Sequence, residues 1–162
     1  MTPLPPVAIG IPTYKRPLML ARLLDSLRPE VEGRDVQVIV ADNAPGPETP
    51  RVIEAHLSAA LYVRVPEPGI SQVRNAIIRT ALRSARPWDW LAMIDDDGRA
   101  EPGWLEALIE GARRFDADVA SGPVLRDLPA GVSLVARNSM FARRPRHDDG
   151  PVSVLHGAQN MA

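Results

Sequence analysis

The sequence predicts an α/β fold in which a mostly parallel sheet lies between helices on both of its faces. Segments typical of buried strands alternate along the chain with segments whose apolar residues recur at helical spacing. Three expected strands also end in polar residues, where open parallel sheets bind ligands. A chain of 162 residues is long enough for a hydrophobic core, and we expect residues 1–162 to form one domain.

The expected strands are short apolar runs, most of them rich in β-branched residues. They cover residues 7–11, 36–41, 61–65, 90–94 and 119–124, and a less regular strand is expected within 132–143. Pro12 is expected to end the first strand, because proline has no N–H group to donate within a sheet.

The expected helices lie between these strands, over residues 17–27, 51–60, 71–84 and about 102–115. In the first of them, four leucines recur at helical spacing and Pro29 is expected to help end the helix. Pro102 fits the first turn of the last helix. Residues 143–150 are expected to form a charged loop.

Composition excludes several classes of function. A net charge of −1 gives no electrostatic reason to expect nucleic acid or an anionic membrane as a partner. Cysteine is absent, which excludes disulfides, zinc–thiolate sites and thiol catalysis. No apolar run approaches the roughly 18–20 residues of a membrane span. We therefore expect a cytoplasmic protein, with peripheral attachment to a membrane left as an alternative.

Three consecutive carboxylates, Asp95-Asp96-Asp97, directly follow the expected strand 90–94. Adjacent like charges are unfavourable unless water, a cation or a ligand rich in hydrogen-bond donors compensates them. Carboxylates at positions i and i+2 of an extended segment point to the same side and can share one divalent ion. The alternative is a solvated aspartate-rich turn in which Gly98 supplies the bend.

Two further strands are expected to end in polar residues at the same edge of the sheet. The first leads into residues 12–16 and the second into Asp42-Asn43. Three converging polar strand ends predict a pocket for a polar, anionic ligand. Arg74 and Asn75 lie in the first turn of an expected helix that starts at this edge, where a guanidinium and helix N-terminal amides suit a diphosphate. The alternative for Arg74 is a solvated helix charge.

Five segments resemble, in order and spacing, the family 2 glycosyltransferases, whose fold is called GT-A: residues 11–17, 42–43, 69–76, 94–97 and 101–105. The resemblance implies a Rossmann-like three-layer α/β/α sandwich. It also implies an enzyme of polysaccharide biosynthesis that depends on Mn²⁺ or Mg²⁺ and inverts the sugar's configuration. The sugar donor would be a UDP- or GDP-sugar, and the acceptor a glycan, a lipid or a small molecule.

The same resemblance implies roles for individual residues. Asp42 would accept a hydrogen bond from the base, and Asp97, together with Asp95, would hold the metal ion. Asp95 or Asp96 would contact the ribose side of the sugar donor. The remaining residues expected to contact the nucleotide-sugar are Pro12, Thr13, Tyr14, Arg16, Asn43, Arg74 and Asn75.

An inverting enzyme also needs a carboxylate base to deprotonate the acceptor hydroxyl. In the family this base follows the matched region, and residues 155–162 resemble the start of the segment that leads to it. The base is therefore unidentified; Asp148 and Asp149 are weak candidates, with a solvated loop as the alternative. Two interpretations stay open, a fragment of a longer enzyme and a non-catalytic module that binds nucleotide-sugars. In either case an uncovered sheet edge would favour self-association.

Other functions fit the motifs less well. The sequence Asp95-Asp96-Asp97-Gly98 also matches the nucleophile motif of haloacid-dehalogenase phosphatases, but these need a downstream lysine, and Lys15 is the only lysine of the chain. Glycine stands too early for an EF-hand calcium loop. The phosphate-binding glycine motifs of P-loop and dinucleotide-binding proteins are absent. His156 is either a metal ligand or a loop histidine, and the tryptophans either pack beside strand 90–94 or form a sugar platform.

Overall fold

The computed structural model describes residues 3–44 and 46–124, together with positions 131, 133, 150, 152, 160 and 161. Its sheet has the strand order β3-β2-β1-β4-β5. The strands are β1 (Val7–Thr13), β2 (Val36–Asp42), β3 (Leu61–Arg64), β4 (Trp90–Ile94) and β5 (Asn160–Met161). The first four strands are parallel, and β5 pairs antiparallel with β4. The predicted α/β fold with a mostly parallel sheet is confirmed.

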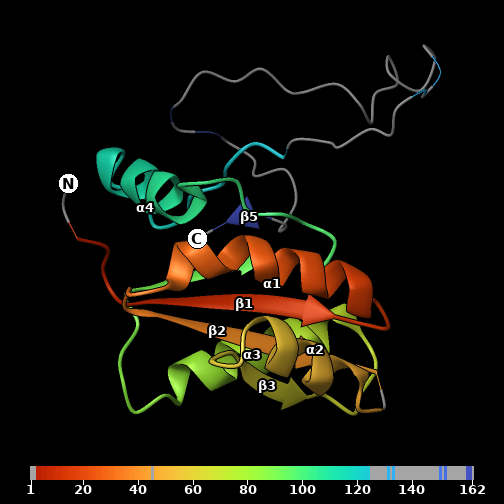
Figure 1. Cartoon of the computed structure of the whole chain (residues 1–162). Helices are drawn as coiled ribbons and strands as arrows, with labels where there is room; N and C mark the ends of the chain where they lie inside the picture. The colour runs from red at the N-terminus through yellow and green to blue at the C-terminus, as the bar shows by residue number, and fades with distance from the viewer. Residues whose placement is uncertain are drawn as a thin grey trace.

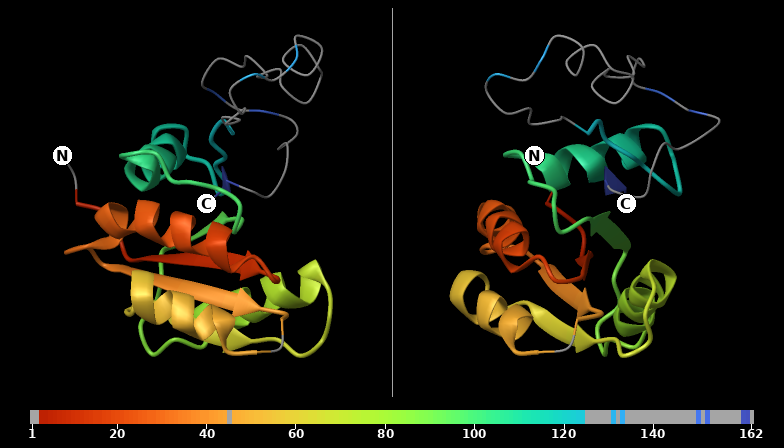
Figure 2. Two further views of the ribbon diagram at one scale, coloured as in Figure 1. Left: turned by 45° about the vertical axis from the view of Figure 1, so that its right-hand side comes forward. Right: turned by 90° about the vertical axis from the view of Figure 1, so that its right-hand side faces the viewer.

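Within the described residues, four helices cover the sheet: α1 (Pro17–Val31), α2 (Glu48–His56), α3 (Ile70–Leu82) and α4 (Trp104–Arg114). α1 and α2 lie on one face of the sheet and α3 lies on the other, so that the sheet is the middle of three layers (Figures 1 and 2). α4 packs on the same side as α1, and β5 lies close to it. Within the part of the chain that the structure describes, no helix is both long and apolar enough to cross a membrane.

The core is divided by the sheet into two apolar clusters. The larger contains the buried leucines of α1 and residues of α2 and α4, whereas the smaller lies under α3. α3 approaches β1 very closely at Gly10, where an added Cβ would lie 2.4 Å from Cγ2 of Ile77. This close packing fixes α3 against the centre of the sheet and thereby fixes the position of its N-terminal half, which carries Arg74.

The prediction that Pro12 ends the first strand is wrong, because β1 continues to Thr13. The Thr13 carbonyl accepts a hydrogen bond from the Asn43 N–H on the β2 side. Backbone groups of consecutive strand residues point to opposite sides, so Pro12 faces β4. The pairing of β1 with β4 already ends at Gly10. Pro12 has no N–H group, but no strand residue is paired with it on the β4 side, so no hydrogen bond of the sheet is lost.

Other boundaries differ for tertiary reasons. Pro29 does not end α1, which continues through Glu30. The buried carboxylate of Glu30 accepts hydrogen bonds from the N–H groups of Gly103 (2.8 Å) and Leu105 (3.1 Å), at the start of α4. The expected strand 119–124 is also wrong: only Ser121 forms a bridge there, and β5 pairs along β4 instead. α2 and α3 end earlier than predicted. The expected strand within 132–143 and the loop at 143–150 lie almost wholly outside the described residues.

Candidate functional site

The polar strand ends meet at one edge of the sheet, as the parallel arrangement requires. Thr13 and Asp42 are register partners at the ends of β1 and β2, and both are buried. Asp95 follows β4 directly. Three residues separate the end of β1 from the start of α1 at the same edge, so the N-terminal turn of α1 also faces the site.

Asp96 is the most enclosed carboxylate of the cluster, with only 4% of its surface exposed. Its Oδ2 accepts hydrogen bonds from Thr13 Oγ1 (2.8 Å) and from the Tyr14 N–H (3.4 Å). Its Oδ1 accepts from Arg16 Nη1 (3.2 Å). The three contacts join the end of β4 to the short connection between β1 and α1. Asp96 therefore positions that connection.

Asp97 is much more open, because about half of its side chain is exposed. Its Oδ2 lies 2.9 Å from Nη1 of Arg16, the same nitrogen that contacts Asp96. The charge of Asp96, supported by that of Asp97, raises the pKa of Arg16 above its already high normal value. Arg16 thus stays cationic between two carboxylates, and its half-exposed side chain is accessible to an anionic ligand.

Asp95 faces a second arginine, because Arg74 Nη2 lies 3.3 Å from its Oδ1. Burial raises the pKa of Asp95, the positive charge of Arg74 opposes this, and the other two aspartates add to the increase. The chain then turns sharply, with the Gly98 N–H donating to the Asp95 carbonyl at 2.9 Å. A Cβ at Gly98 would lie 3.0 Å from that carbonyl oxygen, so glycine suits this tight turn.

The end of β2 is held by backbone groups instead of arginines. The buried Asp42 accepts a hydrogen bond from the Ala44 N–H at 2.7 Å through Oδ1. Tyr62 of β3 is close to it: burial raises the pKa of the Tyr62 phenol and the charge of Asp42 raises it further, against the effect of Arg64. Asp42 therefore lies beside an aromatic ring at the edge of the site.

Asn43 fastens the loop that leads into α3. Its Nδ2 donates to the carbonyls of Val65 (2.8 Å) and Glu67 (2.7 Å), and its Oδ1 accepts from the Gly69 N–H at 3.0 Å. Gly69 has a φ of 129°, a conformation that side chains disfavour. All the strong hydrogen-bonding groups of the Asn43 amide are occupied within the chain, so Asn43 shapes the site through this loop.

Asp95 and Asp97 offer carboxylate oxygens, the type of ligand that Mn²⁺ and Mg²⁺ prefer. Among the described residues, no group of three or more His, Asp or Glu side chains converges as a metal cage. Mg²⁺ usually takes only one or two protein carboxylates and completes its shell with substrate phosphates and water. Two carboxylates at positions i and i+2 beside two arginines match that kind of shared site better than a closed protein cage.

The structure therefore brings together most of the residues selected from the sequence. Thr13, Tyr14 and Arg16 contact the aspartates directly, and Pro12 lies buried at the end of β1. Asn75 is exposed on α3, and its side chain makes no hydrogen bond within the described part of the chain. The predictions for Asp148, Asp149 and His156 fall outside the described residues.

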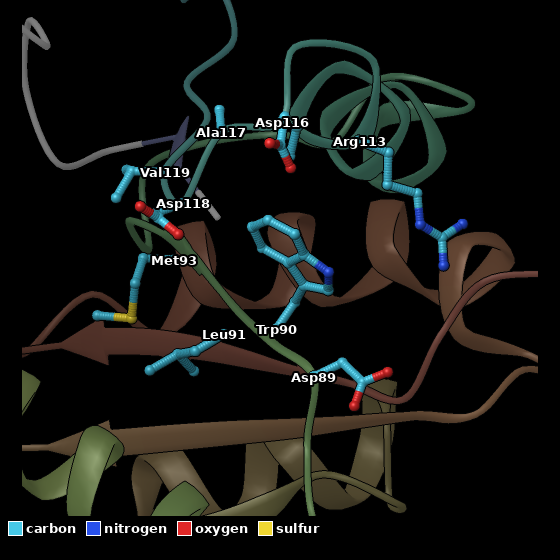
Figure 3. A pocket seen from close by; sticks show the side chains of 10 residues that line it. Asp89, Trp90, Leu91, Met93, Arg113, Asp116, Ala117, Asp118 and Val119 are labelled. Carbon is cyan, nitrogen blue, oxygen red and sulfur yellow. The ribbon is translucent and has the colours of Figure 1, made fainter.

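A separate cavity of about 630 Å³ lies between β4 and the C-terminal end of α4 (Figure 3). Trp90 rises from β4 into it, towards the end of α4, and none of Asp95, Asp96 and Asp97 lines it. Trp90 and Trp104 pack against the larger apolar cluster, and Trp88 against the smaller one. This packing role is one of the two alternatives open from the sequence.

Two features of the site were missed in the sequence. The sequence groups Asp96 with its neighbours as a nucleotide-sugar contact, whereas in the structure Asp96 is buried and accepts hydrogen bonds from Thr13, Tyr14 and Arg16. No signal in the sequence separates Asp96 from Asp95 and Asp97, because these contacts join segments that are distant in the chain. Tyr62 carried no signal, because its proximity to Asp42 depends on the pairing of β2 with β3.

Known proteins are similar to this chain over most of its length. A model of the family described as "Glycosyl transferase family 2" matches residues 8–160. The succinoglycan biosynthesis protein ExoM of Rhizobium meliloti is 33% identical over 123 residues, which cover 73% of this chain and 38% of that protein. An N-acetylglucosaminyl-diphospho-decaprenol L-rhamnosyltransferase of Mycobacterium tuberculosis is 31% identical over 141 residues, covering 83% of this chain and 45% of that protein.

Among solved structures, a mannosyltransferase from Pyrobaculum calidifontis in complex with GDP-Man and Mn²⁺ aligns with a TM-score of 0.56 and 25% identity. The alignment covers 67% of this chain and 32% of that one. The chain thus spans less than half the length of the curated relatives named above and about a third of this structure.

Proposed function

Since the chain belongs to glycosyltransferase family 2, we propose that its strand-end site binds a nucleoside-diphosphate sugar together with a divalent metal ion, for transfer of the sugar to an acceptor. The sugar donor would be a UDP- or GDP-sugar, and the acceptor a glycan, a lipid or a small molecule. The mannosyltransferase bound to GDP-Man and Mn²⁺ supports this class of sugar donor. The similarity to a succinoglycan biosynthesis protein supports a glycan acceptor, and the similarity to an N-acetylglucosaminyl-diphospho-decaprenol L-rhamnosyltransferase supports a lipid acceptor.

The charge balance of the aspartate cluster is the observation that carries the proposal. Three carboxylates contact two arginines, which leaves one negative charge in excess. Such a cluster repels a diphosphate, although its partly exposed arginines are suitable phosphate ligands. One divalent cation on Asp95 and Asp97 reverses the sign of the excess charge. The site should therefore bind a nucleoside diphosphate well only together with a metal ion.

Each arginine has a defined role in the proposal. Arg16 and Arg74 lie near different carboxylates and would contact the diphosphate from two directions. A bound divalent ion would add Lewis-acid stabilisation of the negative charge on the leaving nucleoside diphosphate. The two guanidiniums would stabilise the same charge by hydrogen bonds. Thr13 and Tyr14 would act through Asp96, which fixes the connection that carries Arg16.

The base would be recognised at the end of β2. The carboxylate of Asp42 uses Oδ1 for the Ala44 N–H, and within the described residues its Oδ2 accepts no hydrogen bond. An N–H of uracil or guanine could donate to this oxygen, with Tyr62 nearby. Asn43 would support the base pocket by fixing the loop at residues 65–69. The base that deprotonates the acceptor stays unassigned.

Isothermal titration calorimetry of the 162-residue chain tests the proposal. UDP or GDP should bind measurably in the presence of Mn²⁺ and at least tenfold more weakly in EDTA, because the cluster alone carries excess negative charge. ADP is the control for the base. Equal affinity with and without metal would show that the carboxylates do not act through a metal ion, and absence of all nucleotide binding would contradict the site itself.

A further inference from the structure

The outer side of α3 combines exposed apolar residues with unpaired positive charges. Ile78 and Leu82 are 41% and 80% exposed. They are four residues apart and therefore lie on the same side of the helix, whereas Val73 and Ile77 face the core. Single exposed leucines are common on protein surfaces. An exposed apolar pair that is flanked by charges of one sign is less common and suggests an interaction surface.

The segment that carries this pair contains positive charges only. Residues 68–88 contain four arginines and neither aspartate nor glutamate, in a chain whose net charge is −1. Arg79 and Arg83 are exposed and form no ion pair with any of the described residues. Arg86, by contrast, pairs with Asp35. Cationic charge is thus concentrated beside Ile78 and Leu82 although the protein as a whole is slightly acidic.

We propose that this face of α3, formed by Ile78, Arg79, Leu82 and Arg83, docks on a membrane surface that carries anionic lipids. Leucine and isoleucine side chains gain free energy by entering the boundary between headgroups and acyl chains, and arginines beside them contact lipid phosphates. Charge complementarity selects this occupant, because a face with arginines and no carboxylates suits an anionic surface. Apolar exposure continues at Leu61 of β3, which lines a groove of about 390 Å³ together with Arg83.

The position of the face gives the docking a structural consequence. Arg74, which contacts Asp95, is on the same helix eight residues before Leu82. At a rise of 1.5 Å per residue, the two positions are separated by about 12 Å along the helix axis. Docking through the C-terminal half of α3 would therefore hold the aspartate cluster close to the lipid surface. The docking itself does not depend on which ligand that cluster binds.

Vesicle flotation of the full 162-residue chain tests the proposal, with vesicles of phosphatidylcholine alone or with about one third phosphatidylglycerol. The wild-type chain should float with the anionic vesicles and remain unbound with the neutral ones. The double variant I78S/L82S should lose about tenfold or more in affinity for the anionic vesicles. Its matched control is L18S/M19S on α1, where the two side chains are 78% and 46% exposed. This control should bind as the wild type does.

A second pair of variants isolates the charge. R79Q/R83Q should weaken binding roughly 30-fold, since each arginine near an anionic surface contributes about 1 kcal/mol. R22Q/R51Q removes the same charge from exposed positions on α1 and α2 and should change little. The proposal would be overturned if the wild-type chain did not bind anionic vesicles, or if each double variant on α3 lost no more affinity than its matched control. Sedimentation showing a dimer that I78S/L82S dissociates would also overturn it, because the face would then be an interface between two copies.

Discussion

The two sides of the polar sheet edge are held by different kinds of contact. Where β1 and β4 end, carboxylates face arginine side chains that are partly exposed, as in the contact between Arg16 and Asp97. Where β2 ends, Asp42 and Asn43 are held by backbone N–H and carbonyl groups. An arginine can exchange a carboxylate for a phosphate by a change of rotamer, whereas a backbone contact can change only if a loop moves. The arginine side is therefore suited to accept ligand charge, and the backbone side to present a fixed shape.

The largest effect is expected for D97N. Loss of this half-exposed carboxylate should weaken Mn²⁺-linked UDP or GDP binding by on the order of 100-fold, because one of the two proposed protein ligands of the ion is lost. The melting temperature should stay unchanged, since Asp97 makes one exposed ion pair. Calorimetry and thermal melts measure the two quantities. D89N, at an exposed position away from the cluster, is the matched control for charge. A clear drop in melting temperature for D97N would indicate a structural role instead.

Substitution of the adjacent Asp96 should mainly change stability, whereas substitution of Asp97 should mainly change binding. D96A removes a buried carboxylate with three hydrogen-bond partners and should lower the free energy of unfolding by about 2 kcal/mol. In a chain of this size the melting temperature should fall by roughly 4–8 °C. Denaturant unfolding provides the free energy. If D96A unfolds like the wild type yet loses metal-linked binding, Asp96 is a ligand contact and the distinction from Asp97 disappears.

N43A tests the end of β2, where the Asn43 side chain is held by backbone groups. It removes three hydrogen bonds between the end of β2 and the loop at residues 65–69, which should destabilise the protein by about 1–2 kcal/mol. Because these partners are uncharged, the loss should be the same between about 0.05 and 0.5 M NaCl. Unfolding curves at both salt concentrations measure it. A loss that shrinks in high salt would mean that this side, too, depends on charge.

Substitution of Asp42 tests whether the end of β2 selects the base of the bound nucleotide. If its free oxygen accepts from the base, D42A should reduce the preference between UDP and ADP, or between GDP and ADP, by about five- to tenfold. Metal dependence should be unaffected, because the aspartates after β4 remain in place. Competition titrations with paired nucleotides measure the preference. Unchanged selectivity would leave Asp42 as a residue that only supports the turn at Ala44.

Much of this arrangement could be predicted from the sequence because it depends on local patterns. Alternation of strand and helix patterns predicted the parallel sheet, and parallel strands necessarily bring Thr13, Asp42 and Asp95 to one edge. Trp90–Ile94 was predicted with its correct bounds, since apolar residues stop abruptly at charges. Such features need no knowledge of which residues contact one another.

The rest depended on contacts between distant segments. Pro12 stays in its strand because pairing with β4 ends two residues earlier, and α1 continues past Pro29 where Glu30 meets the start of α4. The role of Asp96 likewise follows from its contact with Thr13, 83 residues away in the chain. Val119 and Val124 suggested a strand, but β5, from the far end of the chain, pairs along β4. Local propensity carries no information about these pairings.

The smallest effect on stability is expected for R16Q. This variant tests whether the arginine contacts at the ends of β1 and β4 differ from the backbone contacts at the end of β2. About half of the Arg16 side chain is exposed, so its ion pairs with Asp96 and Asp97 should contribute less than about 0.5 kcal/mol to the free energy of unfolding. Even this contribution should vanish at about 0.5 M NaCl, unlike the loss in N43A. The same variant should weaken binding of UDP or GDP in the presence of Mn²⁺, while the bare nucleoside binds as it does to the wild type, because only the diphosphate interacts with the guanidinium. R22Q, on the exposed side of α1, is the control for charge. A large, salt-independent loss of stability in R16Q would mean that this arginine is a fixed structural element, and the contrast between an exchangeable and a fixed side of the site would fail.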